Sequence, residues 1–274
     1  MNITVLMTTY NCAPYLSQSI RSVLNQTYKN FEFLIIDDGS NDDTESILKN
    51  FNDSRIRYIK IEHLGRSAVL NYGLKISQND WVVLMDADDI AHPKRLELQL
   101  KNFDFKNNSV SCTWCAYFFQ RKISYLVQTP LNNFTLKQKM SLHSYICNQS
   151  VIFNKSFVLS NGGYNEQLSN SEDYELWLRL LNKVNYFVIP EYLLFVRERE
   201  NSLSRTNLLN TKKNIIEFLK DYSDFDNYFK INNPNDQKII LGWREYFYGD
   251  REKAREHWIK LSFKILLYPK VILG

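Results

Sequence analysis

The sequence predicts an α/β fold with a mainly parallel sheet, followed by a helical extension. In residues 3–86, short apolar runs alternate with amphipathic helical segments. Such alternation is typical of βαβ units, whose helices pack on a parallel sheet. Beyond residue 205 only helical patterns follow. The length of 274 residues leaves room for one sizeable domain and an appended helical unit.

The elements of the parallel part follow from their periodicity. The expected strands cover residues 3–8, 31–36, 56–61 and 81–85, and the expected helices cover 14–26, 41–51 and 66–77. Three of the strands end in polar clusters, at residues 8–11, 37–40 and 86–89. The carboxyl ends of parallel strands share one edge of the sheet, and ligands bind in the crevice beyond that edge. We therefore expect the three clusters to form one site.

The last cluster holds three carboxylates. Alternate side chains of a strand share a face, so Asp86 and Asp88 are expected to point the same way, and Asp89 to lie on the opposite face in a structural role. Paired carboxylate oxygens suit Mg²⁺ or Mn²⁺. A D-x-D pattern alone leaves a second interpretation open, a solvated acidic turn.

The second half of the chain is less regular. Strands are expected at residues 109–120 and 149–153, with two short strands around Pro190 within 186–196. Residues 124–142 have no clear periodicity, and we expect them to pack over the site. A helix begins at Glu172 and Asp173, whose carboxylates either complement the helix dipole or take part in catalysis.

Composition narrows the class of protein. The chain has 44% hydrophobic and 23% charged residues, as folded soluble proteins do, and its net charge of +4 does not indicate nucleic-acid binding. Without a signal peptide or a long uncharged apolar run, we expect a cytoplasmic location. Cys112 and Cys115 form a C-x-x-C with no second pair and no spaced histidines, so buried free thiols on opposite faces of a strand are expected.

The loop after the first expected strand contains no glycine. It matches neither the dinucleotide fingerprint G-x-G-x-x-G nor the P-loop, so dehydrogenase and P-loop NTPase functions are poor interpretations. Its hydroxyls and its aromatic ring suit a nucleobase, and Asp38 can accept the imide hydrogen of a uracil.

Five motifs occur along the chain in a recognisable order and spacing. They are Thr8-Thr9-Tyr10-Asn11; Asp37-Asp38-Gly39-Ser40 with Asp42, Asn71 and Gly73; Asp86-Ala87-Asp88-Asp89 with Pro93 and Arg95; Gly162-Gly163-Tyr164; and Ser171-Glu172-Asp173 with Trp177. Together they resemble the inverting glycosyltransferases of family 2, which have the GT-A fold of nucleotide-diphospho-sugar transferases. The resemblance implies a catalytic domain at residues 1–205, which leaves 206–274 as a helical extension.

The resemblance also implies a nucleotide-sugar-binding set. Thr8 and Tyr10 would hold the uridine, with the tyrosine ring against the base, and Asp38 would bond the edge of the base. Arg66 would lie beside the base, and Asn71 belongs to the same set. Three other interpretations stay open: Tyr10 as a core aromatic residue, Asp38 as a turn-former, and Arg66 as an exposed helix start.

For the chemistry, the resemblance makes Asp173 the catalytic base, with Glu172 orienting the acceptor. Inversion at an anomeric carbon needs a base on the side opposite the leaving nucleotide. Asp88 would ligate a Mn²⁺ or Mg²⁺ ion that bridges the diphosphate, and Asp86 would reach the ribose or the metal. Arg197 either contacts phosphate or belongs to a solvated charge run.

The function implied is a metal-dependent inverting transfer of a sugar, from a nucleotide donor such as a UDP-sugar to a hydroxyl of a glycan or a glycolipid. Cell-surface polysaccharide synthesis is the expected setting. Two alternatives are a sugar-phosphate nucleotidyltransferase and a non-catalytic sugar-nucleotide-binding assembly protein. Asn148 stands where relatives commonly have a histidine, and its role is left open.

The extension contains one tetratricopeptide-like helix pair, marked by Gly242, Tyr246, Gly249, Ala254 and Trp258. A single pair cannot stand as a solenoid, so it packs on the catalytic domain or on another subunit, which would make a homo-oligomer. Residues 258–274 mix lysines with aromatic and aliphatic residues. They form either a membrane-surface helix on the inner face of the cell membrane or a helix that packs on the core.

Overall fold

A computed structural model of the chain describes residues 2–101, 103–168, 170–199, 208–259 and 261. Its parallel half contains β1 (Ile3–Thr9), β2 (Phe31–Asp37), β3 (Ile56–Lys60) and β4 (Trp81–Asp86), with α1 (Ala13–Leu24), α2 (Thr44–Leu48) and α3 (Arg66–Ile76) between them. These strands and helices confirm the predicted alternation. Helix α2 is shorter than predicted because Asp42 is used outside it: the backbone N–H of Ala13 donates to Asp42 Oδ2 at 2.9 Å.

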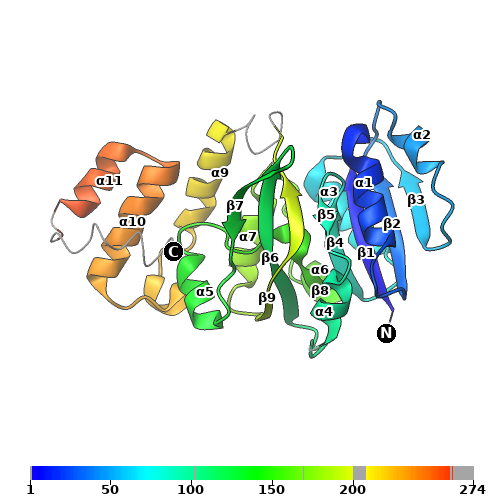
Figure 1. The fold of residues 1–274 in the computed structure, drawn as a ribbon. Coiled ribbons are helices and arrows are strands. Elements are labelled where there is room, and N and C mark those ends of the chain that lie inside the picture. The colour runs from blue at the N-terminus through cyan, green and yellow to red at the C-terminus, as the bar shows by residue number, and fades with distance from the viewer. Residues whose placement is uncertain (1, 102, 169, 200–207, 260, 262–274) are drawn as a thin grey trace.

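The remaining strands extend the sheet in mixed directions. They are β5 (Ile90–Ala91), β6 (Ser109–Phe119), β7 (Lys122–Val127), β8 (Ile152–Asn154) and β9 (Asn185–Arg197). Within the described residues the sheet has nine strands in the order β3-β2-β1-β4-β8-β6-β9-β5, with β7 paired to β6 (Figure 1). Strands β1 to β4 are parallel, β8 is antiparallel to both β4 and β6, and β9 is parallel to β6.

Three details of the second half correct the prediction. Residues 185–197 form one strand, because the irregularity around Pro190 is absorbed as register shifts against Thr113 and Trp114. Strand β8 begins only at Ile152, after the short helix η1 (Asn148–Ser150). Residues 124–142 contain most of β7 and the whole of α5 (Asn133–Lys139).

Helix α5 lies with the helices of the extension and not over the strand ends. Its residue Leu136 is fully buried in a cluster that includes Leu178 of α7 (Glu172–Leu180) and Phe225 of η2 (Phe225–Phe229). Just after α5, the carbonyl of Met140 accepts a hydrogen bond from the Tyr174 hydroxyl at 2.7 Å. Helix α5 therefore packs with α7 and the extension, and the expectation that residues 124–142 cover the site stays a prediction.

The core lies on both faces of the sheet, because successive side chains of each buried strand point to opposite sides. Val5 and Met7 pack with α1 and α4 (Arg95–Lys101), whereas Leu6 packs with α3 and α6 (Lys155–Ser160). Cys112 and Cys115 divide between these two clusters, and both are buried free thiols, as predicted.

The extension shares the core of the sheet. Its helices α9 (Leu208–Lys220), α10 (Pro234–Tyr248) and α11 (Arg251–Trp258) gather at the end of the molecule away from β2 and β3 (Figure 1). Ile215 and Phe218 of α9 belong to the cluster that packs against α7. Helices α10 and α11 pack together, and a Cβ on Gly242 would lie 2.0 Å from Trp258 Nε1.

Two features predicted for the extension lie outside the residues that the structure describes. The boundary at 205/206 and the residues after Leu261 lie outside them, so the domain division and the membrane-surface helix stay predictions. Among the helices of the described residues, none combines the length and the apolar character needed to cross a bilayer.

Candidate active site

The carboxyl ends of β1, β2 and β4 meet at one edge of the sheet. In the sheet register, Thr8 lies beside Asp86, and Thr9 lies beside Asp37. Strand β2 follows β1 on one side, and β4 returns to its other side, so the strand order reverses at β1. Open α/β sheets bind ligands in the crevice at such a switch point. The prediction that the polar clusters meet is confirmed.

The loops after β1 and β2 hold each other in place. The backbone N–H of Asn11 donates to Ser40 Oγ at 2.9 Å, and the N–H of Asn41 donates to Asn11 Oδ1 at 2.9 Å. Asn11 has a φ of 48°, a left-handed conformation that asparagine tolerates better than most residues. These bonds fix the base of the loop that carries Tyr10.

Tyr10 follows β1 in this loop and is 46% exposed, so it is not a core aromatic residue. Its ring stacks on His63, with centroids 4.3 Å apart and an interplanar angle of 26°. The buried Asp38 fixes that histidine, because Asp38 Oδ2 lies 2.9 Å from His63 Nδ1. The same carboxylate accepts the backbone N–H groups of Leu64 at 2.7 Å and Gly65 at 3.0 Å. Asp38 thus shapes the wall beside Tyr10, and its contact with a base stays a prediction.

The three aspartates after β4 form one cluster. One carboxylate oxygen from each of Asp86, Asp88 and Asp89 lies within 4.8 Å of the others. The expectation that Asp89 faces away is wrong, because the strand ends at Asp86 and a turn follows, in which the Asp89 N–H donates to the Asp86 carbonyl at 3.3 Å. Side-chain alternation applies only within the extended strand.

Burial and mutual repulsion both disfavour the ionised forms of Asp88 and Asp89. Burial, followed by the charges of its two neighbours, raises the pKa of Asp89 well above its usual value, and burial with the Asp86 charge raises the pKa of Asp88. Asp89 Oδ2 is buried and has no hydrogen-bond partner among the described residues. Clustered hard oxygens with an unused buried acceptor fit a divalent cation of the Mg²⁺ or Mn²⁺ type.

Two arginines from the end of β9 reach the same cluster. Arg197 donates its Nε–H to the Asp88 carbonyl and its backbone N–H to Asp89 Oδ1, each at 2.9 Å. Arg199 Nε lies 2.7 Å from Asp88 Oδ2 in an ion pair. Arg197 is therefore no solvated charge, and its contact with phosphate stays a prediction. Arg199 was not predicted; it lies beyond the end of β9, where strand periodicity no longer indicates which way a side chain points.

Arg66 connects the acidic cluster to the start of α7. Its Nε donates to Glu172 Oε1 at 2.6 Å, and its second terminal nitrogen donates to both carboxylate oxygens of Asp86 at 3.1 and 3.2 Å. The Asp86 charge is the main cause that raises the pKa of Arg66 further. Arg66 is therefore not an exposed helix start, and its place beside a base stays a prediction.

Asp173 follows Glu172 in the first turn of α7. Burial is the main cause that raises its pKa to about 6, the negative charge of Glu172 adds to the rise, and Arg66 opposes it. The backbone N–H of Tyr174 donates to Asp173 Oδ1 at 2.8 Å. A carboxylate with a pKa near the working pH meets the requirement for a general base.

Asn71 lies in the wall that supports α7. Its Nδ2 donates to the Tyr164 carbonyl and to Glu166 Oε1, and its Oδ1 accepts from the Tyr164 N–H, each at 2.8 Å. Gly163 permits this approach, because a Cβ there would lie 2.5 Å from Asn71 Oδ1, and its φ is +63°. Both amide hydrogens of Asn71 are used within the protein, so its membership of the nucleotide-sugar-binding set stays a prediction.

Asn148 joins the same wall to α7 from the other side. It is buried, and its Oδ1 accepts hydrogen bonds from the Tyr164 hydroxyl and from Trp177 Nε1, both at 3.1 Å. The role that the sequence left open is therefore structural in this arrangement. Neither this junction nor the stack of His63 on Tyr10 has a signature in the sequence, because both depend on long-range packing.

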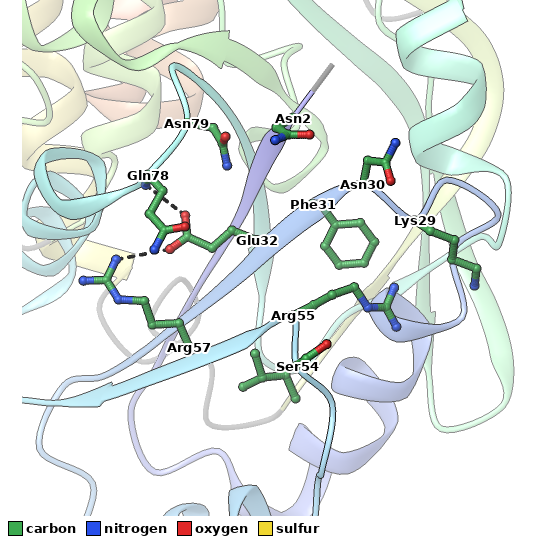
Figure 2. A pocket seen from close by; sticks show the side chains of 11 residues that line it. Asn2, Lys29, Asn30, Phe31, Glu32, Ser54, Arg55, Arg57, Gln78 and Asn79 are labelled. Carbon is green, nitrogen blue, oxygen red and sulfur yellow. Dashed lines mark hydrogen bonds and ion pairs between the residues drawn. The ribbon is translucent and has the colours of Figure 1, made fainter.

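A pocket of about 370 Å³ lies at the opposite edge of the sheet (Figure 2). Phe31 and Ile56, at the amino ends of β2 and β3, line it. Three of its charged side chains already interact within the protein: Arg57 lies 3.1 Å from Glu32, and Arg55 covers the Phe31 ring at 4.7 Å. This pocket is separate from the site at the carboxyl ends.

Comparisons with known proteins find relatives that are named glycosyltransferases. The sequence model for glycosyl transferase family 2 matches residues 4–160. An uncharacterised glycosyltransferase of Methanocaldococcus jannaschii is 33% identical over 90% of this chain and 86% of its own length. The UDP-Glc:alpha-D-GlcNAc-diphosphoundecaprenol beta-1,3-glucosyltransferase WfgD of Escherichia coli is 30% identical over 68% of this chain and 72% of its own.

Two solved structures show the same fold. The crystal structure of S. aureus TarS (residues 1–349) in complex with UDP-GlcNAc has a TM-score of 0.69 at 17% identity, covering 98% of this chain and 78% of that one. The mannosyltransferase PcManGT from Pyrobaculum calidifontis, in complex with GDP-Man and Mn²⁺, has a TM-score of 0.62 at 16% identity, covering 99% and 79%. The fold of these neighbours is that predicted here, and the match to the family model shows that this chain belongs to glycosyl transferase family 2.

Proposed function

We propose that this protein is a metal-dependent inverting glycosyltransferase. It transfers a sugar from a UDP-sugar to a hydroxyl of a glycan or a lipid-linked glycan in the synthesis of a cell-surface polysaccharide, on the cytoplasmic side of the membrane. The observation that carries the proposal is the bridge made by Arg66, which holds Asp86 at the end of β4 and Glu172 at the start of α7 on one guanidinium. The bridge brings the acidic cluster after β4, which is suited to bind a metal and a diphosphate, close to Asp173, which is suited to act as a base.

The donor side consists of groups that suit the parts of a nucleoside diphosphate. The exposed ring of Tyr10 offers a stacking surface for the base, and Asp38 offers carboxylate oxygens for its edge. Thr8 lies beside Asp86 in the register, which supports its assignment to the uridine part of the donor. Arg197 offers a guanidinium, which suits phosphate oxygens, directly beside the acidic cluster.

Asp86, Asp88 and Asp89 would hold the divalent cation. When bound, a Mn²⁺ or Mg²⁺ ion at this cluster offsets the negative charge that develops on the departing nucleoside diphosphate. The neighbouring arginines already balance part of the carboxylate charge, since Arg199 pairs with Asp88 and Arg66 pairs with Asp86. The carboxylate donors and the unpartnered Asp89 Oδ2 favour a cation there.

Asp173 performs the acid–base step. Its carboxylate takes the proton of the acceptor hydroxyl as that oxygen attacks the anomeric carbon, from the face opposite the nucleotide. Burial keeps this carboxylate basic enough to accept a proton, because its pKa of about 6 lies above that of an ordinary aspartate. Glu172, held beside it by Arg66, orients the acceptor.

The donor and the metal can be tested together in a thermal-shift screen. The purified protein is heated with UDP-GlcNAc, UDP-Glc, other UDP-sugars and GDP-Man, each with and without Mn²⁺. A ligand at 100 times its Kd stabilises the folded state by roughly 2.7 kcal/mol, a clear shift in melting temperature. We expect the shift for a UDP-sugar, and only in the presence of Mn²⁺.

Transfer from the selected donor is then followed by NMR of the product. An anomeric configuration opposite to that of the donor supports the proposal. A retained configuration, or a nucleotide-sugar shift that Mn²⁺ does not change, contradicts it. Asp43→Asn, on the exposed loop before α2, is the matched control for variants that lose an aspartate of the acidic cluster.

A further inference from the structure

The hairpin of β6 and β7 carries an exposed apolar surface next to the active site. Phe119, Ile123, Tyr125 and Leu126 are between 37 and 54% exposed. Strand β7 pairs with β6 on one edge, and among the described strands its other edge has no partner. Large apolar side chains gathered on a free edge strand are unusual on a protein surface that faces only water.

The tip of this hairpin is positively charged. Arg121 and Lys122 lie between Phe119 and Ile123, both are exposed, and neither forms an ion pair with a residue that the structure describes. The sequence has no aspartate or glutamate between Asp104 and Glu166. The surface therefore combines apolar side chains with uncompensated cations.

Both faces of β7 are exposed, which favours a lipid surface over a folded protein partner. Tyr125 stacks on Tyr117 on one face of the hairpin, while Leu126, one residue further along, points to the other face. A folded partner that pairs with one face leaves the other in water. The interfacial layer of a bilayer can surround both, and aromatic and cationic residues are enriched at that depth.

The hairpin is connected to the acidic cluster through Arg197. Phe118 is in register with Arg197, and the Arg197 guanidinium lies 4.6 Å from the centroid of the Phe118 ring. The Phe118 carbonyl accepts the backbone N–H of Glu198 at 2.8 Å. Since Arg197 also bonds the Asp88 carbonyl, a membrane in contact with the hairpin tip lies beside the diphosphate side of the site.

We propose that residues 119–126 dock on a lipid surface that carries anionic headgroups. Insertion is shallow, because the unpaired backbone groups of β7 need polar partners that only the headgroup layer supplies. Docking would bring the site to an acceptor that is anchored in the membrane, and this benefit rests on the proposed function. The docking on lipid does not itself depend on the proposed function.

The test measures binding of the full chain to phosphatidylcholine vesicles, with and without phosphatidylglycerol, by co-sedimentation. We expect binding only to the anionic vesicles. Arg121→Gln with Lys122→Gln should weaken it roughly 25-fold, because each cation near an anionic surface contributes about a fivefold factor. Ile123→Ser with Leu126→Ser should weaken it at least tenfold. Lys29→Gln with Lys75→Gln, which removes two exposed lysines on other elements, is the matched control and should change it little.

A second measurement locates the contact. A dye attached through Ile123→Cys should brighten with anionic vesicles, whereas a dye attached through Lys29→Cys should not, and the four native cysteines are buried. The proposal is overturned by any of three results: the full chain does not bind anionic vesicles, the hairpin variants bind them as tightly as the native protein, or the control pair weakens vesicle binding as much as the hairpin variants do. Loss of a dimer in the hairpin variants, without any vesicle binding, would instead assign the surface to a second copy. UDP binding measured in parallel separates these results from a failure of the proposed function.

Discussion

The pKa of Asp173 depends on Glu172 in a direction that the structure fixes. Burial, the largest cause, and the Glu172 charge raise this pKa from 3.8 to about 6, although Arg66 lowers it. Glu172→Gln removes the raising charge and also frees the Arg66 guanidinium from its bond to Glu172 Oε1. Both changes favour ionised Asp173, so the pKa of Asp173 should fall in the variant.

The rise in the pKa of Asp173 in the native protein, about 2 units, corresponds to about 3 kcal/mol, and burial, which the substitution preserves, is its largest cause. The pKa of Asp173 in Glu172→Gln should therefore lie below about 6. A base acts only when deprotonated, so kcat/KM should rise with pH through about 6 in the native protein and through a lower pH in Glu172→Gln. Well below both midpoints, each unit by which the pKa falls raises the ionised fraction of Asp173 about tenfold, relative to each protein's own plateau.

Two measurements check this prediction. The pH dependence of kcat/KM is recorded with the donor found in the screen, since kcat/KM reports groups of the free enzyme. The carboxyl carbon of Asp173 is titrated by NMR in protein labelled at aspartate, with Asp173→Asn identifying the signal. If the titration midpoint in Glu172→Gln stays at that of the native protein or moves upward, the electrostatic account of the base is wrong.

Three further predictions concern the metal and the walls of the site. Asp88→Ala should abolish Mn²⁺-dependent UDP binding, and calorimetry that gives the same UDP affinity with and without Mn²⁺ in the native protein would contradict the metal assignment. Arg66→Gln leaves Asp86 and Glu172 without their shared cation and should lower the free energy of unfolding by about 3 kcal/mol; an unchanged midpoint in urea would refute this. Asn148→Ala leaves two buried donors unpaired and should lower the free energy of unfolding by about 2 to 4 kcal/mol, seen as a lower melting temperature.

The sequence predicted the parallel half of the fold because β1, β2 and β4 are buried apolar runs and all four strands are bounded by clear turn signals. The convergence of Thr8, Asp38 and Asp86 followed from topology alone, since parallel strands deliver their carboxyl ends to one edge. The orientation of Asp89 was wrong because the rule of alternating faces was carried past the end of β4. A turn replaces the strand there, and turns have no period.

The rest of the site depends on contacts between residues far apart in the sequence. Arg66 and Glu172 are 106 residues apart, and the stack of His63 on Tyr10 exists because Asp38 holds the loop before α3. Local propensity does not encode such pairs. Arg199 is a further case, because it lies beyond the end of β9 and reaches the acidic cluster through its ion pair with Asp88.

The central claim is that Asp173 removes the proton from the acceptor while the groups at the ends of β1, β2 and β4 hold the donor. Asp173→Asn tests it most directly, because the amide keeps the shape of the side chain and cannot act as a base. Donor binding by calorimetry should be unchanged, and transfer should fall by a factor on the order of 10² to 10⁴. Transfer at the native rate, with donor binding intact, would contradict the account.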